Sequence, residues 1–151
     1  MFDEWKHQAI DDVREVTRAH VAKWHGCSPE RLTAHAERCS VKVAGCLPLS
    51  AHLDQGRVGT IQVVIALSPT KFVIWPRSHT VALNPQGKGY YVLTPTDLAK
   101  LQTAGSVKTE IPSDPGDVLF FLGGKIVHGS PAVVDNEGTR FATYAHWIPP
   151  E

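Results

Sequence analysis

The sequence is poor in several features that would assign it to particular protein classes. It has three cysteines, Cys27, Cys39 and Cys46, and no C-x-x-C pair. An odd number at these spacings argues against a disulfide framework or a structural zinc site, so we expect reduced, mostly buried thiols. The formal net charge is zero, because 15 basic residues balance 15 acidic ones. Composition therefore gives no global electrostatic argument for binding nucleic acid or an anionic membrane.

Long hydrophobic runs are absent as well. No apolar stretch approaches the ~20 residues needed to cross a bilayer. The N-terminal segment MFDEWKHQAIDD is acidic and mixed, whereas a signal peptide is basic and then apolar. We therefore expect a cytoplasmic protein without a membrane span. No repeat or linker divides the 151 residues, so we expect one domain over 1–151.

The first forty residues favour helices. Apolar or small residues recur at helical spacing before Gly26, at Ile10, Val13, Thr17, Val21 and Trp24. Ser28 followed by Pro29 is a helix start signal, and we expect a second helix from there to about Cys39. We expect this helical part, residues 1–40, to pack outside a β-rich part formed by residues 41–151.

Strand patterns dominate the remainder, which predicts a mainly β fold. Short apolar or alternating runs indicate strands at 60–67, 72–75, 90–93, 107–112 and 118–122. One helix interrupts them, DLAKLQTAG, for which we expect Thr96 as the cap and Gly105 as the end.

The stretch from Pro115 to Arg140 combines a turn, a strand, a histidine and an arginine. Pro115-Gly116-Asp117 is typical of a turn, and VLFFL after it is typical of a core strand. His128 lies on the next short segment, IVHGS. After the polar turn DNEG, TRFATYAHWI alternates with period two. This pattern predicts that His128 and Arg140 lie on neighbouring strands of one sheet.

A second constellation occurs upstream, at His52-Leu53-Asp54. Residues i and i+2 of a strand point to the same face, so His52 and Asp54 would present an imidazole and a carboxylate together. With His128 they would form two imidazoles and one carboxylate, the facial triad of non-haem Fe(II) oxygenases. Arg140 would supply a planar fork for a carboxylate ligand. An H-x-D triplet alone is weak evidence, because such triplets occur by chance.

The ordered combination of motifs is more specific. The chain has HLD at 52–54, VIALSP and FVIWPRSHT within 64–80, PGDVLFF at 115–121, and then His128, Gly129, Ser130, Asn136 and Arg140. In these motifs it resembles the Fe(II)/2-oxoglutarate-dependent dioxygenases, most closely the phytanoyl-CoA dioxygenase group.

The resemblance implies a fold and an activity. The fold would be a double-stranded β-helix, a jelly-roll or cupin-like barrel with the metal near one mouth. The activity would be hydroxylation of an unactivated C–H bond with O2, coupled to conversion of 2-oxoglutarate to succinate and CO2. By position, His52, Asp54 and His128 would bind Fe(II). Arg140 would hold the distal carboxylate of 2-oxoglutarate, and Ser130 would assist it.

Two further positions bear on this interpretation. Gln62 is a polar residue inside a strand; it either faces the cavity and contacts 2-oxoglutarate or faces solvent, and both interpretations remain open. Where many relatives read P-G-S-H, this chain reads Pro76-Arg77-Ser78-His79, which puts the conformation of this turn in question. The resemblance suggests a structural role for His79, so we leave it out of the triad.

The sequence indicates neither the substrate nor an oligomeric state. A small molecule, a lipid conjugate, a protein side chain and a nucleobase are all open. The alternative function is a barrel that binds metal without catalysis, or a cupin-type metal enzyme that does not use 2-oxoglutarate. Arg140 discriminates between them, because its predicted role requires a carboxylate ligand.

Overall fold

The computed structural model describes residues 11, 15, 17–54, 59–84, 90–133 and 140–148, without the side chains of 35–41, 90 and 140–146. Ile10, Val13 and Asn136, which figured in the predictions, lie outside the described residues.

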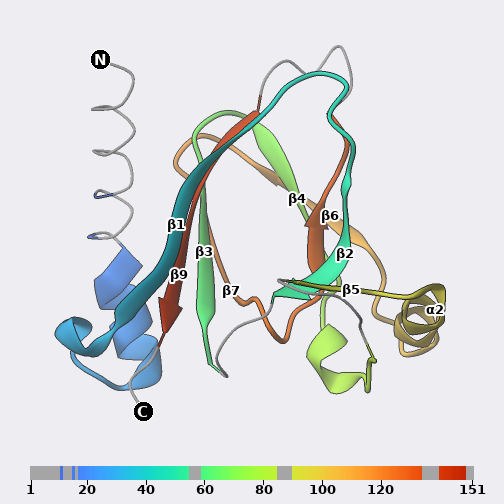
Figure 1. The fold of residues 1–151 in the computed structure, drawn as a ribbon, viewed down its shortest axis with the longest axis horizontal. Coiled ribbons are helices and arrows are strands. Elements are labelled where there is room, and N and C mark those ends of the chain that lie inside the picture. The colour runs from blue at the N-terminus through green and yellow to red at the C-terminus, as the bar shows by residue number, and fades with distance from the viewer. Residues whose placement is uncertain are drawn as a thin grey trace.

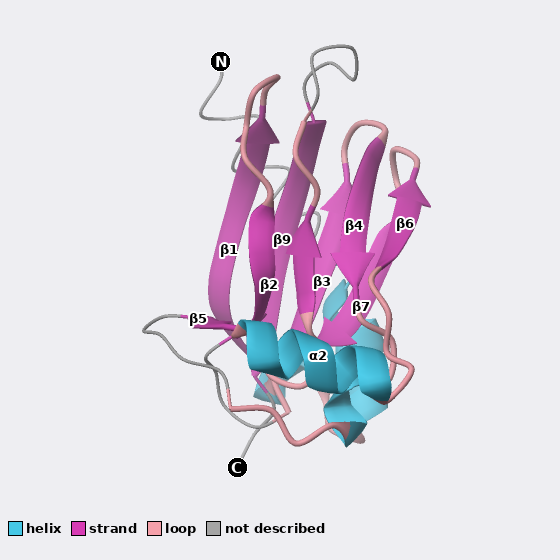
Figure 2. Ribbon diagram, turned by 90° about the vertical axis from the view of Figure 1, so that its right-hand side faces the viewer, coloured by secondary structure: helices cyan, strands magenta, loops and turns pink. Residues whose placement is uncertain are grey.

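The described residues form nine strands in two antiparallel sheets, so the prediction of a mainly β fold is confirmed (Figures 1 and 2). The four-stranded sheet has the order β1 (Thr33–Lys42), β9 (Arg140–Ile148), β3 (Ile61–Ala66) and β7 (Val118–Leu122). The five-stranded sheet has the order β5 (Tyr90–Val92), β2 (Leu49–Asp54), β8 (His128–Ser130), β4 (Thr70–Ile74) and β6 (Thr109–Ser113).

The two faces of β3 border different cores. Val64 packs with Phe72 of β4 and Phe121 of β7, so this face looks into the space between the sheets. Ile61 and Val63 belong to another cluster on the opposite face. Because side chains alternate along a strand, Gln62 shares the interior face with Val64.

The helical segment 17–25 covers the outer face of the four-stranded sheet. Val21 and Ala22 are buried in one cluster with Ile61, Val63 and Trp147. The Trp147 indole donates a hydrogen bond to Thr17 Oγ1 at 2.9 Å. Trp24, which the helical pattern placed on the same face, is instead 62% exposed.

The predicted second helix is wrong. Pro29–Arg31 form only the 3-10 turn η1, with Pro at its first or second position, and the chain then enters β1. β1 pairs with β9 along its whole length, from Thr33 opposite Ile148 to Lys42 opposite Arg140. Pairing with a distant strand therefore overrides the local helix signal, and the helical part ends well before residue 40.

α2 (Pro95–Thr103) is the predicted helix, but its cap is Thr94, not Thr96. Thr94 Oγ1 accepts a hydrogen bond from Asp97 N, and Asp97 accepts one in return from Thr94 N, a capping box. The buried Asp97 carboxylate also accepts a hydrogen bond from Asn84 N at 3.0 Å. This bond, followed by those from Thr94, lowers the pKa of Asp97 below its ordinary value.

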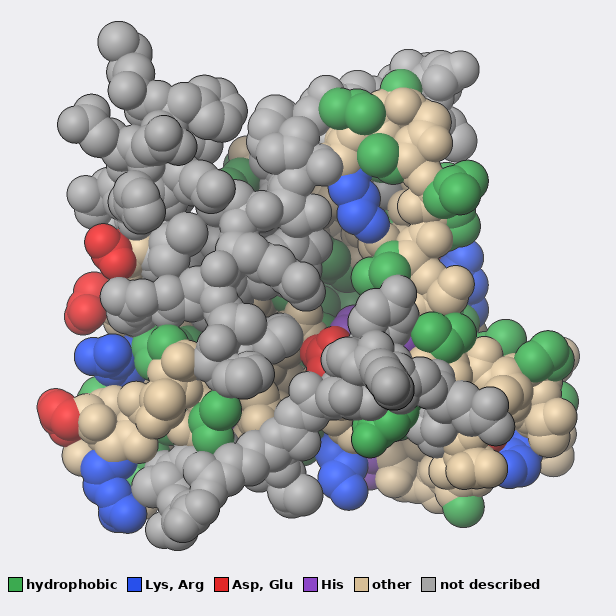
Figure 3. All heavy atoms as spheres, in the orientation of Figure 1, with side chains coloured by type: hydrophobic (Ala, Val, Ile, Leu, Met, Phe, Trp, Pro, Cys, Tyr) green, Lys and Arg blue, Asp and Glu red, His purple; other side chains and the backbone are tan. Residues whose placement is uncertain are grey.

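Two surface features complete the description. Apolar side chains are exposed around the connection between β1 and β2, at Val43, Leu47 and Leu49 (Figure 3). Cys27 and Cys46 are free thiols and are only partly buried.

None of the described helices combines the length and apolar character that crossing a membrane requires.

Candidate metal centre

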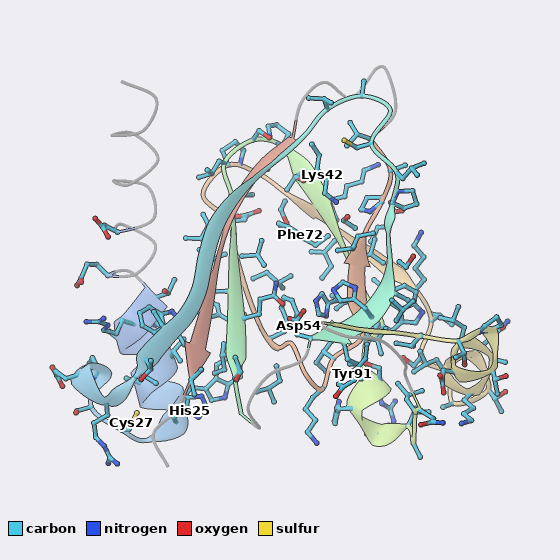
Figure 4. The ribbon with its side chains drawn as sticks, in the orientation of Figure 1. His25, Cys27, Lys42, Asp54, Phe72 and Tyr91 are labelled. Atoms are coloured by element: carbon cyan, nitrogen blue, oxygen red, sulfur yellow. The ribbon has the colours of Figure 1, made fainter. Side chains whose placement is uncertain are left out.

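His52, Asp54 and His128 come together at the paired ends of two strands. His52 and Asp54 belong to β2, and β2 pairs with β8 through His52 opposite His128. One ligand atom from each residue lies within 4.8 Å of the others. Asp54 is at the end of β2, on the side that faces β3 and β7 (Figure 4). The interstrand pairing and the i, i+2 spacing thus put two imidazoles and one carboxylate at one point.

Both imidazoles are oriented by backbone carbonyl groups. His52 Nδ1 lies 2.7 Å from Ser50 O, and His128 Nδ1 lies 2.9 Å from Ile126 O. A carbonyl oxygen only accepts, so each Nδ1 carries a proton and Nε2 is the ring nitrogen that can serve as a metal-ligand atom. These Nε2 atoms lie 3.7 Å and 3.5 Å from the Asp54 oxygens. The three donor atoms converge with the orientation that metal-binding histidines require.

The side chains of the triad are largely shielded from solvent. The His52 and His128 side chains are 5% and 9% exposed, and the Phe121 ring packs against His128 with 4.7 Å between ring centroids. Asp54 is more open, at 20%. Two neutral imidazoles and one carboxylate, with access on the carboxylate side, fit a non-haem Fe(II) site.

Asp54 has two close neighbours from the other sheet and its loop. Asp54 N donates to Gly123 O at 2.9 Å, just after β7. A Cβ added to Gly123 would lie 2.3 Å from Asp54 Oδ2 and 3.2 Å from Gln62 Oε1. Gln62 is 5% exposed, so the solvent-facing interpretation of this residue is wrong. Sequence reasoning missed Gly123, because one of two adjacent glycines in a turn has no distinctive pattern.

Ser130 contacts the lysine side chain of Lys42, a residue that sequence reasoning missed. Lys42 is half-buried on β1, and its ammonium group donates a hydrogen bond to Ser130 Oγ on β8. The Lys42 side chain therefore crosses from the four-stranded to the five-stranded sheet. Ser130 follows His128 by two residues, so both side chains lie on the same face of β8.

Arg140 is not on a strand next to His128. β8 pairs with β2 and β4, whereas β9 pairs with β1 and β3 in the other sheet. The prediction of neighbouring strands is therefore wrong, because two short segments close in sequence joined opposite sheets. The Arg140 backbone pairs with Lys42, and the Arg140 side chain lies outside the described part of the structure.

The Pro76–His79 turn is structural. Arg77 has a left-handed backbone with φ 65°. Ser78 is buried, and its Oγ accepts a hydrogen bond from Val127 N at 2.8 Å, which ties the turn to the residue before His128. His79 is exposed and does not belong to the cluster of metal-ligand type found among the described residues.

No protein-family model and no curated protein sequence matches this chain. Solved structures do match its fold. EctD from S. alaskensis with bound Fe superimposes with a TM-score of 0.71 and 16% identity, over 95% of this chain and 54% of that chain. The epimerase SnoN in complex with Fe3+, alpha ketoglutarate and nogalamycin RO gives 0.68 and 16%, over 95% and 60%. The alpha ketoglutarate dependent carbocyclase SnoK from nogalamycin biosynthesis gives 0.66 and 20%, over 87% and 54%.

These similarities establish the fold, which is consistent with a cupin-like architecture. This chain spans a little over half the length of those proteins. SnoK and SnoN are described as non-haem, alpha ketoglutarate dependent enzymes, and SnoN was crystallised with Fe3+ and alpha ketoglutarate. EctD was crystallised with Fe and, separately, with 2-oxoglutarate and 5-hydroxyectoine. The present chain has a cluster of metal-ligand type formed by His52, Asp54 and His128.

Proposed function

We propose that this protein is a non-haem Fe(II)- and 2-oxoglutarate-dependent oxygenase, with a double-stranded β-helix of the phytanoyl-CoA dioxygenase type. One observation carries the proposal: three donors of the right chemistry lie within 4.8 Å of one another, with both histidine Nδ1 atoms bonded to backbone carbonyls. Such an arrangement is specific, since structural histidines have no need to turn both Nε2 atoms toward one carboxylate.

His52, Asp54 and His128 would hold Fe(II) through two Nε2 atoms and a carboxylate oxygen. The bound metal would supply activation of O2 coupled to oxidative decarboxylation of 2-oxoglutarate. The protein orients the ligands through Ser50 O and Ile126 O, and the Phe121 ring shields His128 from water. Low water content strengthens the electrostatic interactions inside the site.

Arg140 is proposed to bind the distal carboxylate of 2-oxoglutarate and Ser130 to assist it, with succinate and CO2 as products. Lys42 supports this assignment, because its ammonium contacts Ser130 and its backbone pairs with Arg140. A carboxylate bound beside the Lys42 ammonium would form a charge-assisted hydrogen bond with it.

We propose hydroxylation of a small-molecule C–H bond as the reaction. The names of the matched proteins mention nogalamycin RO and 5-hydroxyectoine, which are small molecules. They also include a carbocyclase and an epimerase, so cyclisation and epimerisation at the same site are second candidates.

Metal and cosubstrate binding test the proposal in sequence. We expect the wild-type chain to bind one Mn(II), followed by EPR of free Mn(II), and then to bind 2-oxoglutarate in calorimetry. His52→Ala should weaken Mn(II) binding by more than about a hundredfold, the upper range for outer-shell changes, because it removes a ligand. His79→Ala, which changes an exposed histidine, should bind as the wild type does.

The alternatives give different results. Mn(II) binding without 2-oxoglutarate binding would favour the cupin-type metal enzyme. Binding of both without succinate from any candidate substrate would favour a non-catalytic barrel. Absence of Mn(II) binding would reject a metal centre altogether.

A further inference from the structure

The Asp54 carboxylate lies in a cradle made by Gly123 and Gln62, which we call the Asp54 cradle. Gly123 follows β7 and Gln62 lies in β3, so both belong to the four-stranded sheet or its loops. The three metal-ligand residues instead belong to strands of the five-stranded sheet. The carboxylate is therefore held from the opposite sheet.

Gly123 provides the space that Asp54 occupies. Its missing Cβ would lie 2.3 Å from Asp54 Oδ2 and 3.2 Å from the carboxylate carbon. Real Cβ atoms do not approach an oxygen so closely, so any side chain at this position would displace the carboxylate. Gly123 has no left-handed φ, unlike Gly116 or Gly105. Its lack of a side chain is thus needed for packing against Asp54 and not for backbone conformation.

Gln62 is a buried amide beside the same carboxylate. Gln62 Oε1 has no hydrogen-bond partner among the described residues. It lies 3.2 Å from the position that a Cβ added to Gly123 would occupy, and Asp54 Oδ2 lies 2.3 Å from the same position. A buried acceptor without a donor is unfavourable, because it loses its hydrogen bonds to water without replacement. Rotating the amide by half a turn exchanges oxygen and nitrogen without changing its shape. It would put an N–H donor at the position of Oε1, next to the same Gly123 site that the carboxylate borders.

We propose that Gln62 and Gly123 are positioning residues of the metal centre. Gln62 donates a hydrogen bond to the Asp54 carboxylate, and Gly123 leaves the space in which this carboxylate faces both histidines. The inference rests on the proposed function, because it takes His52, Asp54 and His128 as the metal ligands. It assigns Gln62 to Asp54 and not to 2-oxoglutarate.

The glycine is tested with a matched pair of variants. Gly123→Ala should weaken Mn(II) binding about tenfold or more, within the 10–100-fold range of outer-shell changes. Gly124→Ala is the control, because its added Cβ would meet only Asp54 O, at an ordinary 3.4 Å. We expect Gly124→Ala to change the Mn(II) affinity less than about twofold, within the scatter of neutral surface changes. Equal affinities for both variants would overturn the role of Gly123.

The glutamine is tested in the absence of 2-oxoglutarate. Gln62→Met keeps the size of the side chain and removes the amide, and we expect Mn(II) affinity to fall about tenfold. Gln102→Met on the exposed face of α2 is the control. If Mn(II) affinity is unchanged and only 2-oxoglutarate binding to the Mn(II)-loaded protein weakens, Gln62 contacts the cosubstrate and the proposal fails.

Two further measurements separate the possible failures. Far-UV circular dichroism of the metal-free variants checks folding, and Gln62→Asn, which withdraws the amide by one methylene, replaces Gln62→Met if that variant does not fold. The absorption spectrum of bound Co(II) should change in Gly123→Ala and Gln62→Met if the carboxylate moves. A wild-type chain that binds no metal would reject the proposed function together with the cradle, whereas metal binding that survives both substitutions unchanged would reject the cradle alone.

Discussion

At the residue scale, Arg77 carries backbone strain that no side-chain contact in the described structure explains. Its φ of 65° lies in the left-handed region, where a Cβ is unfavourable and glycine is at ease. The sequence had shown that an arginine stands where many members of the resembled family have glycine, which left the turn in question. The structure shows that Arg77 itself adopts the left-handed backbone conformation that glycine favours.

Arg77→Gly should therefore stabilise the protein. Removing a left-handed non-glycine residue gains about 1 kcal/mol, part of the 1–3 kcal/mol that such strain costs. Urea unfolding followed by circular dichroism measures the change. Arg77→Ala separates backbone from side chain, because alanine keeps the Cβ and should leave the free energy of unfolding within about 0.5 kcal/mol of wild type, as exposed substitutions do. Equal gains in both variants would refute the strain explanation.

At the scale of secondary-structure elements, local sequence signals predicted the start of an element better than its type. Ser28 and Pro29 do start a helical turn, but it lasts three residues. The following residues then pair with β9, more than a hundred positions away, and no local pattern reveals such a partner. The same limit explains β8 and β9. The sequence pattern predicted that both segments are strands. Their assignment to different sheets depends on pairing with β1, β2, β3 and β4, which no local pattern indicates.

The candidate site was more accessible to sequence reasoning than the sheets. His52 and Asp54 were found because period two fixes their common face, and His128 because a strand and a turn precede it. Lys42 and Gly123 were missed, since a lysine at a strand end and a glycine in a turn have many ordinary roles. Both make contacts across the space between the sheets, and these exist only in the folded chain.

The capping box of α2 predicts a pH-dependent contribution to stability. Hydrogen bonds from Asn84 N and Thr94 lower the folded pKa of Asp97 below its ordinary 3.8. A depressed pKa means that this stabilisation is present above pH 3.8 and is lost as pH falls through the folded value.

Asp97→Asn should lower the free energy of unfolding by about 1.5–3 kcal/mol at pH 7, the range for hydrogen bonds to a charged group. The difference from wild type should narrow as the pH falls below the ordinary pKa of 3.8, for example at pH 3, because the stability that comes from the lowered pKa is progressively lost there. Urea unfolding at both pH values measures this, with Asp114→Asn, an exposed acid, as control. A difference that stays constant between pH 7 and pH 3 would contradict the pKa assignment.

The Lys42 side chain extends from β1 to Ser130 in the other sheet, which gives a prediction for 2-oxoglutarate binding. Lys42→Met removes the ammonium beside Ser130, so 2-oxoglutarate should bind the Mn(II)-loaded protein about tenfold or more weakly, as expected when a charge-assisted hydrogen bond is lost. Mn(II) affinity without 2-oxoglutarate should not change. Lys108→Met, an exposed lysine near Glu110, is the matched control in the same calorimetric titration. If Lys42→Met binds 2-oxoglutarate as tightly as the control, Lys42 has no part in the carboxylate site.

At the scale of the whole molecule, the proposed metal centre has neighbours from both sheets. The five-stranded sheet supplies His52, Asp54 and His128, whereas Gln62 and Gly123 approach Asp54 from the four-stranded sheet. Neither sheet alone contains the complete environment of the carboxylate. A ligand that binds this environment binds the folded chain and not the unfolded one, so it must stabilise the entire fold.

Mn(II) should therefore raise the thermal unfolding midpoint. At a free concentration of 100 times the dissociation constant, the gain is about 2.7 kcal/mol. For a chain of this size, about 2–4 °C per kcal/mol gives a shift of roughly 5–10 °C. Calorimetric scans with and without Mn(II) measure it, and His128→Ala should abolish the shift because one ligand is missing. A shift of equal size in His128→Ala would mean that Mn(II) binds elsewhere, and the packing of the two sheets around a shared metal centre would lose its thermodynamic support.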